Sequence, residues 1–419
     1  MGMTMAEKIL ATHSGKDSVA PGEFVTADLD GMMGNDSTFR QALEFIKEAG
    51  LDRVADPEKV VGVIDHWVPA MNVKDAENHL VLRALAKEFG IRHLYDAGSG
   101  IEHTLMVQEG HALPGDLVVG ADSHTTTYGA VACAGTGLGF VEMAYAMYKG
   151  SLWFQVPETI RFVLDGEIQP GVASKDVMLS LMGRYGTDKA QYKAVEFVGP
   201  VADALSVEAR LTMSNIGVEM GTKFAFFAAD EKTVAYLTPR TEREVRIFGP
   251  DADAHYAEEV VIDCSAIEPT VAFPHNPDNV KPISEIGDVP VHQAFIGSCT
   301  NSRTEDLELA AQILKGRKVA EGTRFLVIPS SHEVMENASR NGSLAILIEA
   351  GAMIGTPSCG PCGGCSTGVL GPGENGIATT NRNFKGRMGS PEAFNHLASP
   401  QTVAASAIEG KIADPRKYL

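Results

Sequence analysis

Apolar residues in the first 150 positions recur with the spacing of amphipathic helices. The segments with this spacing are 5–12, 38–48, 75–89 and 140–148. Residues three and four positions apart lie on one face of a helix, so each segment has one face to bury against a core. Gly90 follows the third segment and is expected to end that helix.

Two short runs between these helices have a different pattern. Residues 60–64 and 117–121 are mainly branched aliphatic or small, without polar alternation, which predicts buried strands. Each run ends at polar residues, Asp65 after the first and Asp122 after the second. The alternation of helices and buried strands predicts an α/β fold with functional residues at the carboxyl ends of parallel strands.

The rest of the chain suggests two further regions. Residues 159–164 resemble a strand, a helix-rich stretch follows to about residue 237, and prolines concentrate in 268–283, as in a linker or long crossover. Strand-like runs then return at 291–296, 325–328 and 352–354. We therefore predict three α/β domains, which span residues 1–157, 158–268 and 269–419.

Composition narrows the class of protein. The 419 residues are 44% hydrophobic and 21% charged, as in ordinary globular proteins, and the length suits two or three domains. The formal net charge of −19 argues against nucleic acid and anionic membrane partners, although local arginines can still bind an anionic small molecule. No apolar run has the length of a membrane span, and the N-terminus lacks a signal-peptide pattern. Six scattered cysteines do not suggest disulfides, so we expect a cytoplasmic location.

Three cysteines carry the strongest chemical signal. Cys299 lies in Gly-Ser-Cys-Thr-Asn-Ser at 297–302, and Cys359 and Cys362 form a Cys-x-x-Cys pair at 358–363. Thiolates in glycine-rich turns are the ligands of iron–sulfur clusters. Three thiolates on a four-iron cluster would leave one iron open to act as a Lewis acid on substrate oxygens.

Other readings of these cysteines must be weighed. Structural zinc normally takes four ligands, often from two Cys-x-x-Cys pairs, and the second pair is missing. A redox dithiol would leave Cys299 unexplained. Cys365 continues the spacing of the pair and can be either a fourth ligand, which would close the cluster, or a bystander. Cys133 and Cys264 lie in apolar or strand-like segments, which suggests buried core thiols.

Histidines next to carboxylates are candidate proton-transfer groups. The chain offers Asp65-His66, Glu102-His103 and Asp122-Ser123-His124, and Asn215 and Glu219 are four residues apart. Each pair alone is more often a surface pair or a satisfied core histidine. Two such pairs at the ends of predicted strands favour an acid–base site.

Arg382 and Arg387 are candidate anion-binding groups. They lie in a polar loop at 380–387, which by itself would suggest a solvated basic loop. A guanidinium pairs with a carboxylate through two parallel hydrogen bonds. Beside a cluster with an open iron, the two arginines suggest a polycarboxylate substrate that is activated at its hydroxyl.

Five motifs in this order resemble the large subunit of the aconitase superfamily, in the branch of 3-isopropylmalate dehydratase and homoaconitase. The motifs are Val-Ile-Asp-His at 63–66, Gly-Ala-Asp-Ser-His-Thr at 120–125, Gly-Ser-Cys-Thr-Asn at 297–301, Cys-Gly-Pro-Cys-Gly at 359–363 and Asn-Arg-Asn-Phe at 381–384. The resemblance covers almost the whole chain. It implies an aconitase-like fold of three α/β domains around a central 4Fe–4S cluster.

The resemblance also implies roles for single residues. Cys299, Cys359 and Cys362 would hold the cluster, whose fourth iron binds the substrate hydroxyl and a carboxylate. The implied proton-transfer and positioning pairs are Asp65 with His66, His103 with Asp122, and His124 with Glu219. The implied substrate ligands are Ser123, Asn215, Arg382 and Arg387, and Asn35 and Asp36 fall near a substrate-contacting loop.

Three departures from close relatives concern the substrate more than the chemistry. Glu102 precedes His103 where relatives often carry a small or thiol residue. Gly-Gly-Cys at 363–365 follows Cys362 where a bulkier apolar residue is common, and residues 30–36 are unusual for the isopropylmalate branch.

One motif of the family is absent from the sequence. The family's swivelling fourth domain carries Gly-Ser-Ser-Arg, whose serine removes the carbon-bound proton, and no such motif occurs here. The resemblance therefore implies a separate small subunit that supplies this domain.

The sequence-based hypothesis is the large subunit of a hydro-lyase that dehydrates a hydroxy-polycarboxylate. The first candidate substrate is 3-isopropylmalate, in leucine biosynthesis, followed by homocitrate or homoaconitate and by a methyl-substituted malate. An iron–sulfur electron-transfer or redox-sensing protein would leave the histidine–carboxylate pairs and arginines without a role. A scaffold without a cluster would not explain why every motif is present.

Overall fold

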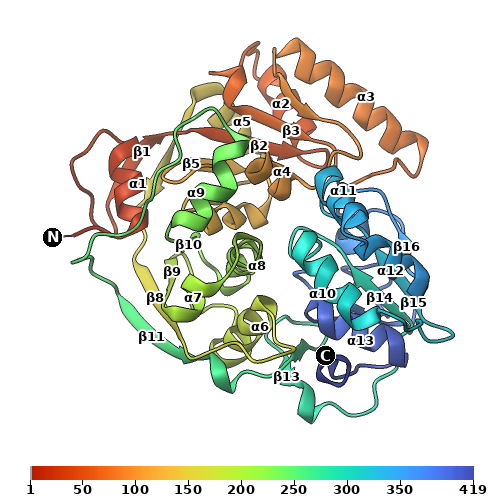
Figure 1. Cartoon of the computed structure of the whole chain (residues 1–419). Helices are drawn as coiled ribbons and strands as arrows, with labels where there is room; N and C mark the ends of the chain where they lie inside the picture. The colour runs from red at the N-terminus through yellow and green to blue at the C-terminus, as the bar shows by residue number, and fades with distance from the viewer. Residues whose placement is uncertain (1) are drawn as a thin grey trace.

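The computed structural model describes residues 2–419 and contains one two-stranded sheet and three larger sheets. Figure 1 shows the N-terminal third of the chain at the top, the middle third at the lower left and the C-terminal third at the right. The chain is therefore an α/β protein, as predicted, and its larger sheets follow one another along the sequence.

The first large sheet has five parallel strands in the order β4-β3-β2-β5-β6. Its strands are β2 (Gly31–Asn35), β3 (Val60–Val63), β4 (His93–Tyr95), β5 (Leu117–Gly120) and β6 (Ala134–Gly137). Its helices are α2 (Phe39–Glu48), α3 (Val73–Glu88), α4 (Glu102–Gln108) and α5 (Phe140–Lys149), with the 3₁₀ segments η1 (Pro57–Lys59) and η2 (Ser123–Val131). The predicted helices and strands of this region are confirmed within two residues, because their apolar patterns match the faces they bury.

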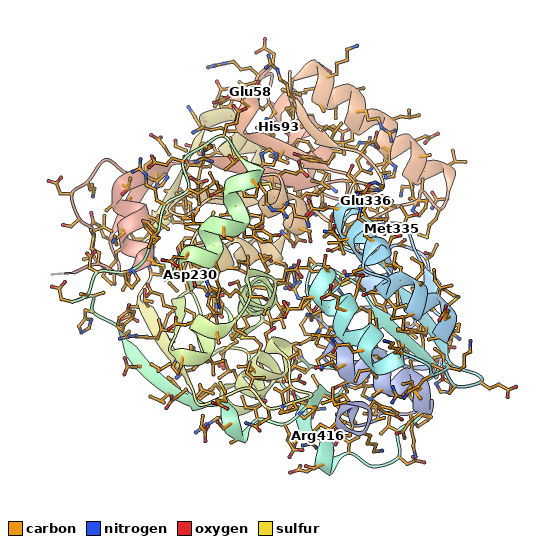
Figure 2. All side chains as sticks on the ribbon, viewed as in Figure 1. Glu58, His93, Asp230, Met335, Glu336 and Arg416 are labelled. Carbon is orange, nitrogen blue, oxygen red and sulfur yellow. The ribbon has the colours of Figure 1, made fainter. Side chains whose placement is uncertain are left out.

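β4 is an edge strand of this sheet, and its side chains are partly exposed. His93 in β4 lies 3.6 Å from the carboxylate of Glu58, and both side chains appear at the top of Figure 2.

The N-terminal segment forms a small unit beside this sheet. α1 (Met5–His13) begins at Thr4 with a capping box, in which Thr4 and Glu7 satisfy each other's backbone amides. β1 (Phe24–Asp28) pairs antiparallel with β7 (Ser151–Gln155).

The second large sheet has four parallel strands in the order β10-β9-β8-β11. Its elements are β8 (Thr159–Asp165), β9 (Ala194–Val198), β10 (Phe224–Phe227), β11 (Glu258–Asp263), α6 (Ser174–Tyr185), α7 (Pro200–Ala204), α8 (Val207–Gly217) and α9 (Glu231–Leu237), with η3 (Val218–Met220), η4 (Thr238–Arg240) and η5 (Cys264–Ala266). The sequence predicted a helix-rich stretch between β8 and about residue 237 and named no strand there, whereas the structure also has β9 and β10. β9 and β10 are short, nearly fully buried runs, which lack the polar alternation that identifies a strand.

The third large sheet has seven strands in the order β13-β12-β18-β17-β14-β15-β16. Its strands are β12 (Thr270–Ala272), β13 (Val280–Pro282), β14 (Gln293–Ile296), β15 (Arg324–Val327), β16 (Met353–Ile354), β17 (Asn375–Ala378) and β18 (Phe394–Leu397). Its helices are α10 (Thr304–Leu314), α11 (His332–Arg340), α12 (Ser343–Ala350) and α13 (Pro400–Glu409), with η6 (Ile283–Glu285), η7 (Gly360–Gly363) and η8 (Pro415–Tyr418).

The proline-rich segment is more than a connection. β12 and β13 within it pair antiparallel, and β12 continues the third sheet through β18. Pro282 ends β13 at the edge of the sheet, where a missing backbone N–H breaks no ladder.

The first and third sheets approach each other where their strands end. The backbone N–H of Cys359 donates to the carbonyl oxygen of Asp65 at 3.0 Å, and that of Ile101 donates to Ser330 at 2.8 Å. Residues that follow β3 and precede α4 therefore meet residues that follow β15 and β16. Among residues 2–419, no helix has the length and apolar character needed to cross a bilayer.

Candidate active site

Polar residues gather at the carboxyl edge of the first sheet. Asn35 ends β2, Asp65 and His66 follow β3, and Asp122 follows β5. These three strands are parallel neighbours, so their carboxyl ends meet at one edge. The sequence-predicted groups of this region are therefore brought together by the topology of the sheet.

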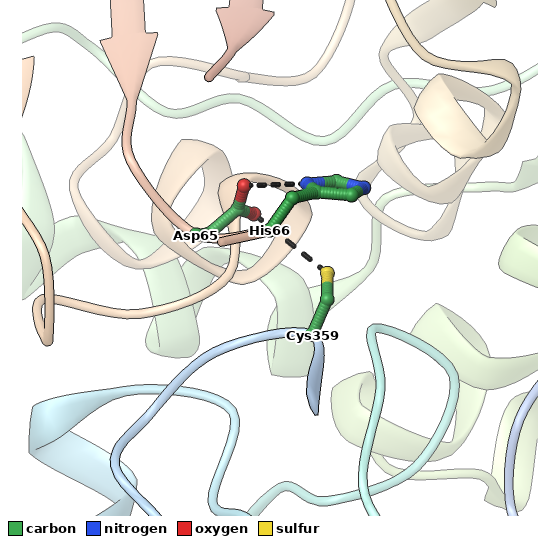
Figure 3. Close-up of side chains that lie close together, drawn as sticks. All are labelled: Asp65, His66 and Cys359. Atoms are coloured by element: carbon green, nitrogen blue, oxygen red, sulfur yellow. Dashed lines mark hydrogen bonds and ion pairs between the residues drawn. The ribbon is translucent and has the colours of Figure 1, made fainter. Parts of the chain in front are cut away.

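Asp65 lies between a histidine and a cysteine. Its Oδ1 is 2.8 Å from His66 Nδ1, and its Oδ2 is 3.9 Å from Cys359 Sγ (Figure 3). Figure 3 shows His66 and Asp65 on one loop, with Cys359 reaching them from the opposite segment. The same Asp65 Oδ2 accepts the backbone N–H of Glu102 at 2.8 Å, so the Asp65 carboxyl is fixed on both oxygens.

The charge state of His66 follows from its surroundings. Burial alone would lower the pKa of His66, but the neighbouring Asp65 carboxylate, with Glu102 and Asp36, raises this pKa well above its ordinary value. The imidazole is therefore protonated near neutral pH, with Nδ1 donating to Asp65. Its Nε2–H can donate a hydrogen bond or a proton to a bound ligand.

His103 and His124 surround Asp122. His103 Nε2 lies 3.0 Å from Asp122 Oδ1, and that same oxygen accepts the backbone N–H of His124 at 2.8 Å. His124 Nε2 lies 2.9 Å from Glu219 Oε1. The structure thus brings His103 to Asp122 and His124 to Glu219, in the pairs that the family resemblance implies.

Asp122 and His103 differ in charge state. Burial would raise the pKa of Asp122, but hydrogen bonds from His103 and His124 hold this pKa well below its ordinary value. Burial lowers the pKa of His103 and outweighs the attraction of Asp122. An ionised Asp122 therefore accepts from a His103 that is neutral near pH 7.

Cys299 lies on a tightly held loop that follows β14. Ser298 has a φ of 77°, which is unusual for a residue with a side chain and is often found at functional sites. The buried guanidinium of Arg303 donates to the carbonyl oxygens of Cys299 and Thr300 at 2.6 and 2.7 Å. The loop backbone is thus fixed independently of any bound group.

Cys359 directly precedes the short turn η7, and Cys362 lies within it. Gly360 inside this turn has a φ of 57°, and a Cβ there would lie 2.5 Å from Ile328 Cδ1. Glycine is needed on both counts. Cys299 and Cys359 belong to one apolar cluster with Ile101, so the turn and the Cys299 loop face each other.

Two buried asparagine amides contact the sulfur atoms. Asn215 Nδ2 lies 3.2 Å and Asn381 Nδ2 lies 3.4 Å from Cys299 Sγ. Asn381 Oδ1 lies 3.7 Å from Cys362 Sγ, so one amide contacts both cysteines. The amide of Asn215 also donates to Thr127 Oγ1 and accepts from Thr300 Oγ1, so both of its polar atoms have protein partners.

The donor set fits an iron–sulfur cluster. Burial raises the pKa of the Cys299 and Cys359 thiols far above the usual range, and neighbouring cysteines and carboxylates raise it further. Such thiols ionise only when a cationic group binds them. Three buried sulfurs with amide N–H groups aimed at one of them are what a thiolate-bound cluster requires.

The remaining cysteines are in different environments. Cys133 and Cys264 are buried in separate apolar cores, as predicted. Cys365 is half-buried. The pKa of its thiol is raised overall, because burial and Cys362 outweigh the opposing effects of His66 and Arg387. Cys365 is therefore near the site without being enclosed like the other three.

The arginines approach the same region. Arg382 Nε lies 2.7 Å from Glu219 Oε1, the oxygen that also contacts His124. Burial lowers the pKa of Arg387, but the nearby Cys362 and Asp122 raise it overall, so the guanidinium stays charged beside the cysteines. Ser123 is half-buried directly after Asp122. The predicted anion-binding groups thus border the histidine–carboxylate pairs and the cysteines.

Two residues that shape the site had no defined role in the sequence analysis, which placed Asp36 only near a substrate-contacting loop and Asn381 only within a motif. Asp36 is buried and accepts the backbone N–H groups of Asp65, His66 and Trp67 at 3.3, 2.9 and 3.0 Å, and His79 Nε2 lies 3.1 Å from it. Asn381 contacts two of the three cysteines, as described above. The position of Asp36 directly after a buried strand was the available signal, because neighbouring strands already carried Asp65 and Asp122 there.

Comparison with known proteins agrees with this geometry. The family model described as "Aconitase family (aconitate hydratase)" matches residues 7–290 and 281–410. The chain is 49% identical to the 3-isopropylmalate dehydratase large subunit of Moorella thermoacetica, over 100% of both chains. It is 48% identical to the 3-isopropylmalate dehydratase large subunit 1 of Methanopyrus kandleri, also over 100% of both chains.

One solved structure shares the fold. The crystal structure of aconitase X from Thermococcus kodakaraensis superposes with a TM-score of 0.51, at 11% identity, over 88% of each chain. This likeness supports an aconitase-like arrangement of the parallel sheets.

Proposed function

The chain belongs to the aconitase family, and we propose that it is the cluster-binding large subunit of a 3-isopropylmalate dehydratase, a hydro-lyase of leucine biosynthesis. The observation that carries the proposal is the contact of Asp65 with both His66 and Cys359, because it joins a proton-transfer pair to a cluster ligand. An electron carrier has no use for this junction.

Cys299, Cys359 and Cys362 would hold a 4Fe–4S cluster. When bound, a cluster with one iron free of protein thiolates supplies a Lewis acid for the substrate hydroxyl. Asn215 and Asn381 would steady the sulfurs, as their contacts with Cys299 and Cys362 suggest. Asn215, which the family resemblance implies as a substrate ligand, also contacts Cys299 Sγ.

The protein's own groups would manage the protons of the dehydration. His66 is protonated at Nε2 and supplies a proton to the departing hydroxyl, while Asp65 stabilises the imidazolium. Asp122 stays ionised and orients His103. His124 is oriented by Glu219 in the same way.

Arg382 and Arg387 would bind the substrate carboxylates, with Ser123 as a further donor. Loss of a proton from carbon beside a carboxylate increases the negative charge on that carboxylate. A fixed guanidinium stabilises this charge without reorganising. The ion pair of Arg382 with Glu219 aligns the guanidinium before substrate binds.

A small subunit would complete the enzyme. The relatives named as large subunits match this chain over their full length, and the Gly-Ser-Ser-Arg motif of the family's serine base does not occur in the sequence. The three large sheets would correspond to domains 1–157, 158–268 and 269–419, with the cluster between the first and third. Buried thiols that must stay reduced suit a cytoplasmic enzyme.

The substrate is tested with a panel of hydroxy acids. The large subunit, loaded with its cluster anaerobically and mixed with the small subunit, is assayed with 3-isopropylmalate, homocitrate and 2,3-dimethylmalate by following alkene absorbance. We expect the highest kcat/KM for 3-isopropylmalate. A clear preference for either of the other two acids would reassign the substrate, and no dehydration of any acid would refute the hydro-lyase.

A further inference from the structure

Glu102 is a buried carboxyl whose side chain is only half satisfied. It begins α4 and is 1% exposed. Its Oε1 accepts from Asn35 Nδ2 at 3.0 Å. Its Oε2 is buried and has no hydrogen-bond partner among residues 2–419. A buried polar atom without a partner costs about 1–3 kcal/mol, so this oxygen calls for an explanation.

The free oxygen belongs to a group that lies inside the candidate site. Glu102, His66 and Asp122 each place one side-chain N or O atom within 4.8 Å of the other two. Glu102 Oε1 also lies 3.5 Å from His103 Nε2. The carboxyl therefore sits between the Asp65–His66 pair and the His103–Asp122 pair, inside the candidate active site.

The surroundings favour the neutral form of this carboxyl. Burial raises the pKa of Glu102 well above its ordinary value, and the carboxylates of Asp65 and Asp122 raise it further, against the opposing effects of His66 and Asn35. The neutral form carries an O–H that needs an acceptor. Neither carboxylate nearby accepts it, so the O–H has no acceptor among residues 2–419.

We propose that Glu102 binds the substrate directly, by donating a hydrogen bond from Oε2 to an oxygen of a substrate carboxylate. This contact rests on the proposed function, because it requires an acid held between the two histidine–carboxylate pairs. It adds to the arginines a donor without charge. The polar group of Glu102 thereby helps to select the acid that binds.

The test measures binding of isopropylsuccinate to the two-subunit enzyme loaded with its cluster. This probe keeps both carboxylates of isopropylmalate and lacks the hydroxyl, so it binds without reacting. Glu102→Leu removes the donor at similar volume, whereas Glu102→Gln retains an N–H donor. Glu196→Gln and Glu196→Leu are the controls, because Glu196 is also buried but its carboxylate accepts from Met5 N and Tyr256 Oη, outside the candidate site.

We expect Glu102→Leu to weaken binding of the probe about 10- to 100-fold, the usual loss for a hydrogen bond to a charged group. Glu102→Gln should keep most of the affinity, and both Glu196 variants that fold should bind as the wild type does. Equal affinity in Glu102→Leu and the wild type overturns the proposal. A loss in Glu102→Gln as large as in Glu102→Leu overturns the donor role.

A second measurement decides the question if Glu102→Leu does not fold. The infrared difference spectrum of the wild type on binding isopropylsuccinate should contain a shifted C=O stretch of a protonated carboxyl, and this band should be missing in Glu102→Gln. The same band in both proteins would refute the proposal. Wild-type turnover of 3-isopropylmalate is measured separately, so that failure of the proposed function is distinguished from failure of this contact.

Discussion

Cys359 and Asp65 are joined twice, by a 3.0 Å backbone hydrogen bond and by a 3.9 Å approach of Cys359 Sγ to Asp65 Oδ2. The two residues are 294 positions apart in the sequence. Asp65 in turn holds His66. A movement of the turn that carries Cys359 would therefore displace Asp65 and, through Asp65, His66.

The three enclosed cysteines should be required for the cluster, and Cys365 should not. Replacing Cys299, Cys359 or Cys362 by Ser should abolish cluster binding, because each removes one of three buried thiolates. Cys365→Ser should retain iron and sulfide, because Cys365 is half-buried and outside the asparagine contacts. Iron and acid-labile sulfide are measured after anaerobic reconstitution. If Cys365→Ser loses the cluster as completely as Cys359→Ser, no iron is left open and the mechanism fails.

Arg387→Lys should lower kcat/KM about 10- to 100-fold with little change in stability, because lysine keeps the charge but loses the planar pair of donors. Steady-state kinetics with the small subunit and thermal unfolding measure the two effects. Arg416→Lys is the control, since Arg416 pairs with Asp414 at the lower edge of Figure 2. Unchanged kinetics in Arg387→Lys would remove this side chain from the site.

The sequence predicted the edge of the first sheet well because the signal there is local. A short aliphatic run followed by Asp65 and His66 predicts a buried strand with polar residues just beyond its carboxyl end. β3 is such a strand. The pairing of Asp122 with His103 could also be predicted, but only from the family resemblance. The contact of Asn381 with Cys299 depends on the pairing of β14 with β17, strands far apart in the sequence, and no local pattern encodes that pairing.

Lys175 illustrates what local pattern leaves out. It lies on α6 and is fully buried, where a charged side chain is rarely expected. Its ammonium donates to the carbonyl oxygens of Thr379 and Thr380 at 2.5 and 2.6 Å. These residues directly precede Asn381 and Arg382, so Lys175 fixes the backbone that delivers both side chains.

Lys175→Met should therefore impair both stability and turnover. Each buried carbonyl left without a donor costs about 1–3 kcal/mol of unfolding free energy, and displacement of Arg382 should raise KM. Thermal unfolding and steady-state kinetics measure these effects. Lys411→Met is the control, because Lys411 makes an exposed pair with Asp288 and should change little. A Lys175→Met enzyme with wild-type melting temperature and KM would show that the contact is dispensable.

His13 and Asp30 should make stability depend on pH far from the site. Their side chains meet at 2.5 Å. Burial would lower the pKa of His13, but hydrogen bonds with Asp30 and Ile9 raise it overall, and burial of Asp30 is likewise outweighed by His13, so the pKa of Asp30 falls. The contribution of His13 is complete below its unfolded pKa and is lost as pH rises through its folded pKa. That of Asp30 is lost as pH falls through its own folded pKa.

The melting temperature of His13→Leu should therefore fall furthest below that of the wild type in mildly acidic solution, between the two folded pKa values. The gap should narrow at alkaline pH. Thermal unfolding across this pH range measures it, and His255→Leu at an exposed position is the control. A gap that widens with rising pH would contradict the assigned direction of the His13 shift.

The central claim is that this chain holds the cluster, the histidine–carboxylate pairs and the arginines, while a separate small subunit supplies the base for the carbon-bound proton. Proton transfer by a placed base contributes about 10²–10⁴ in rate, so the isolated chain should dehydrate 3-isopropylmalate negligibly. The decisive measurement follows alkene formation by the anaerobically loaded chain, alone and after addition of the small subunit. We predict activity only in the mixture. Full activity of the isolated chain would show that the base lies within these 419 residues and would contradict the account.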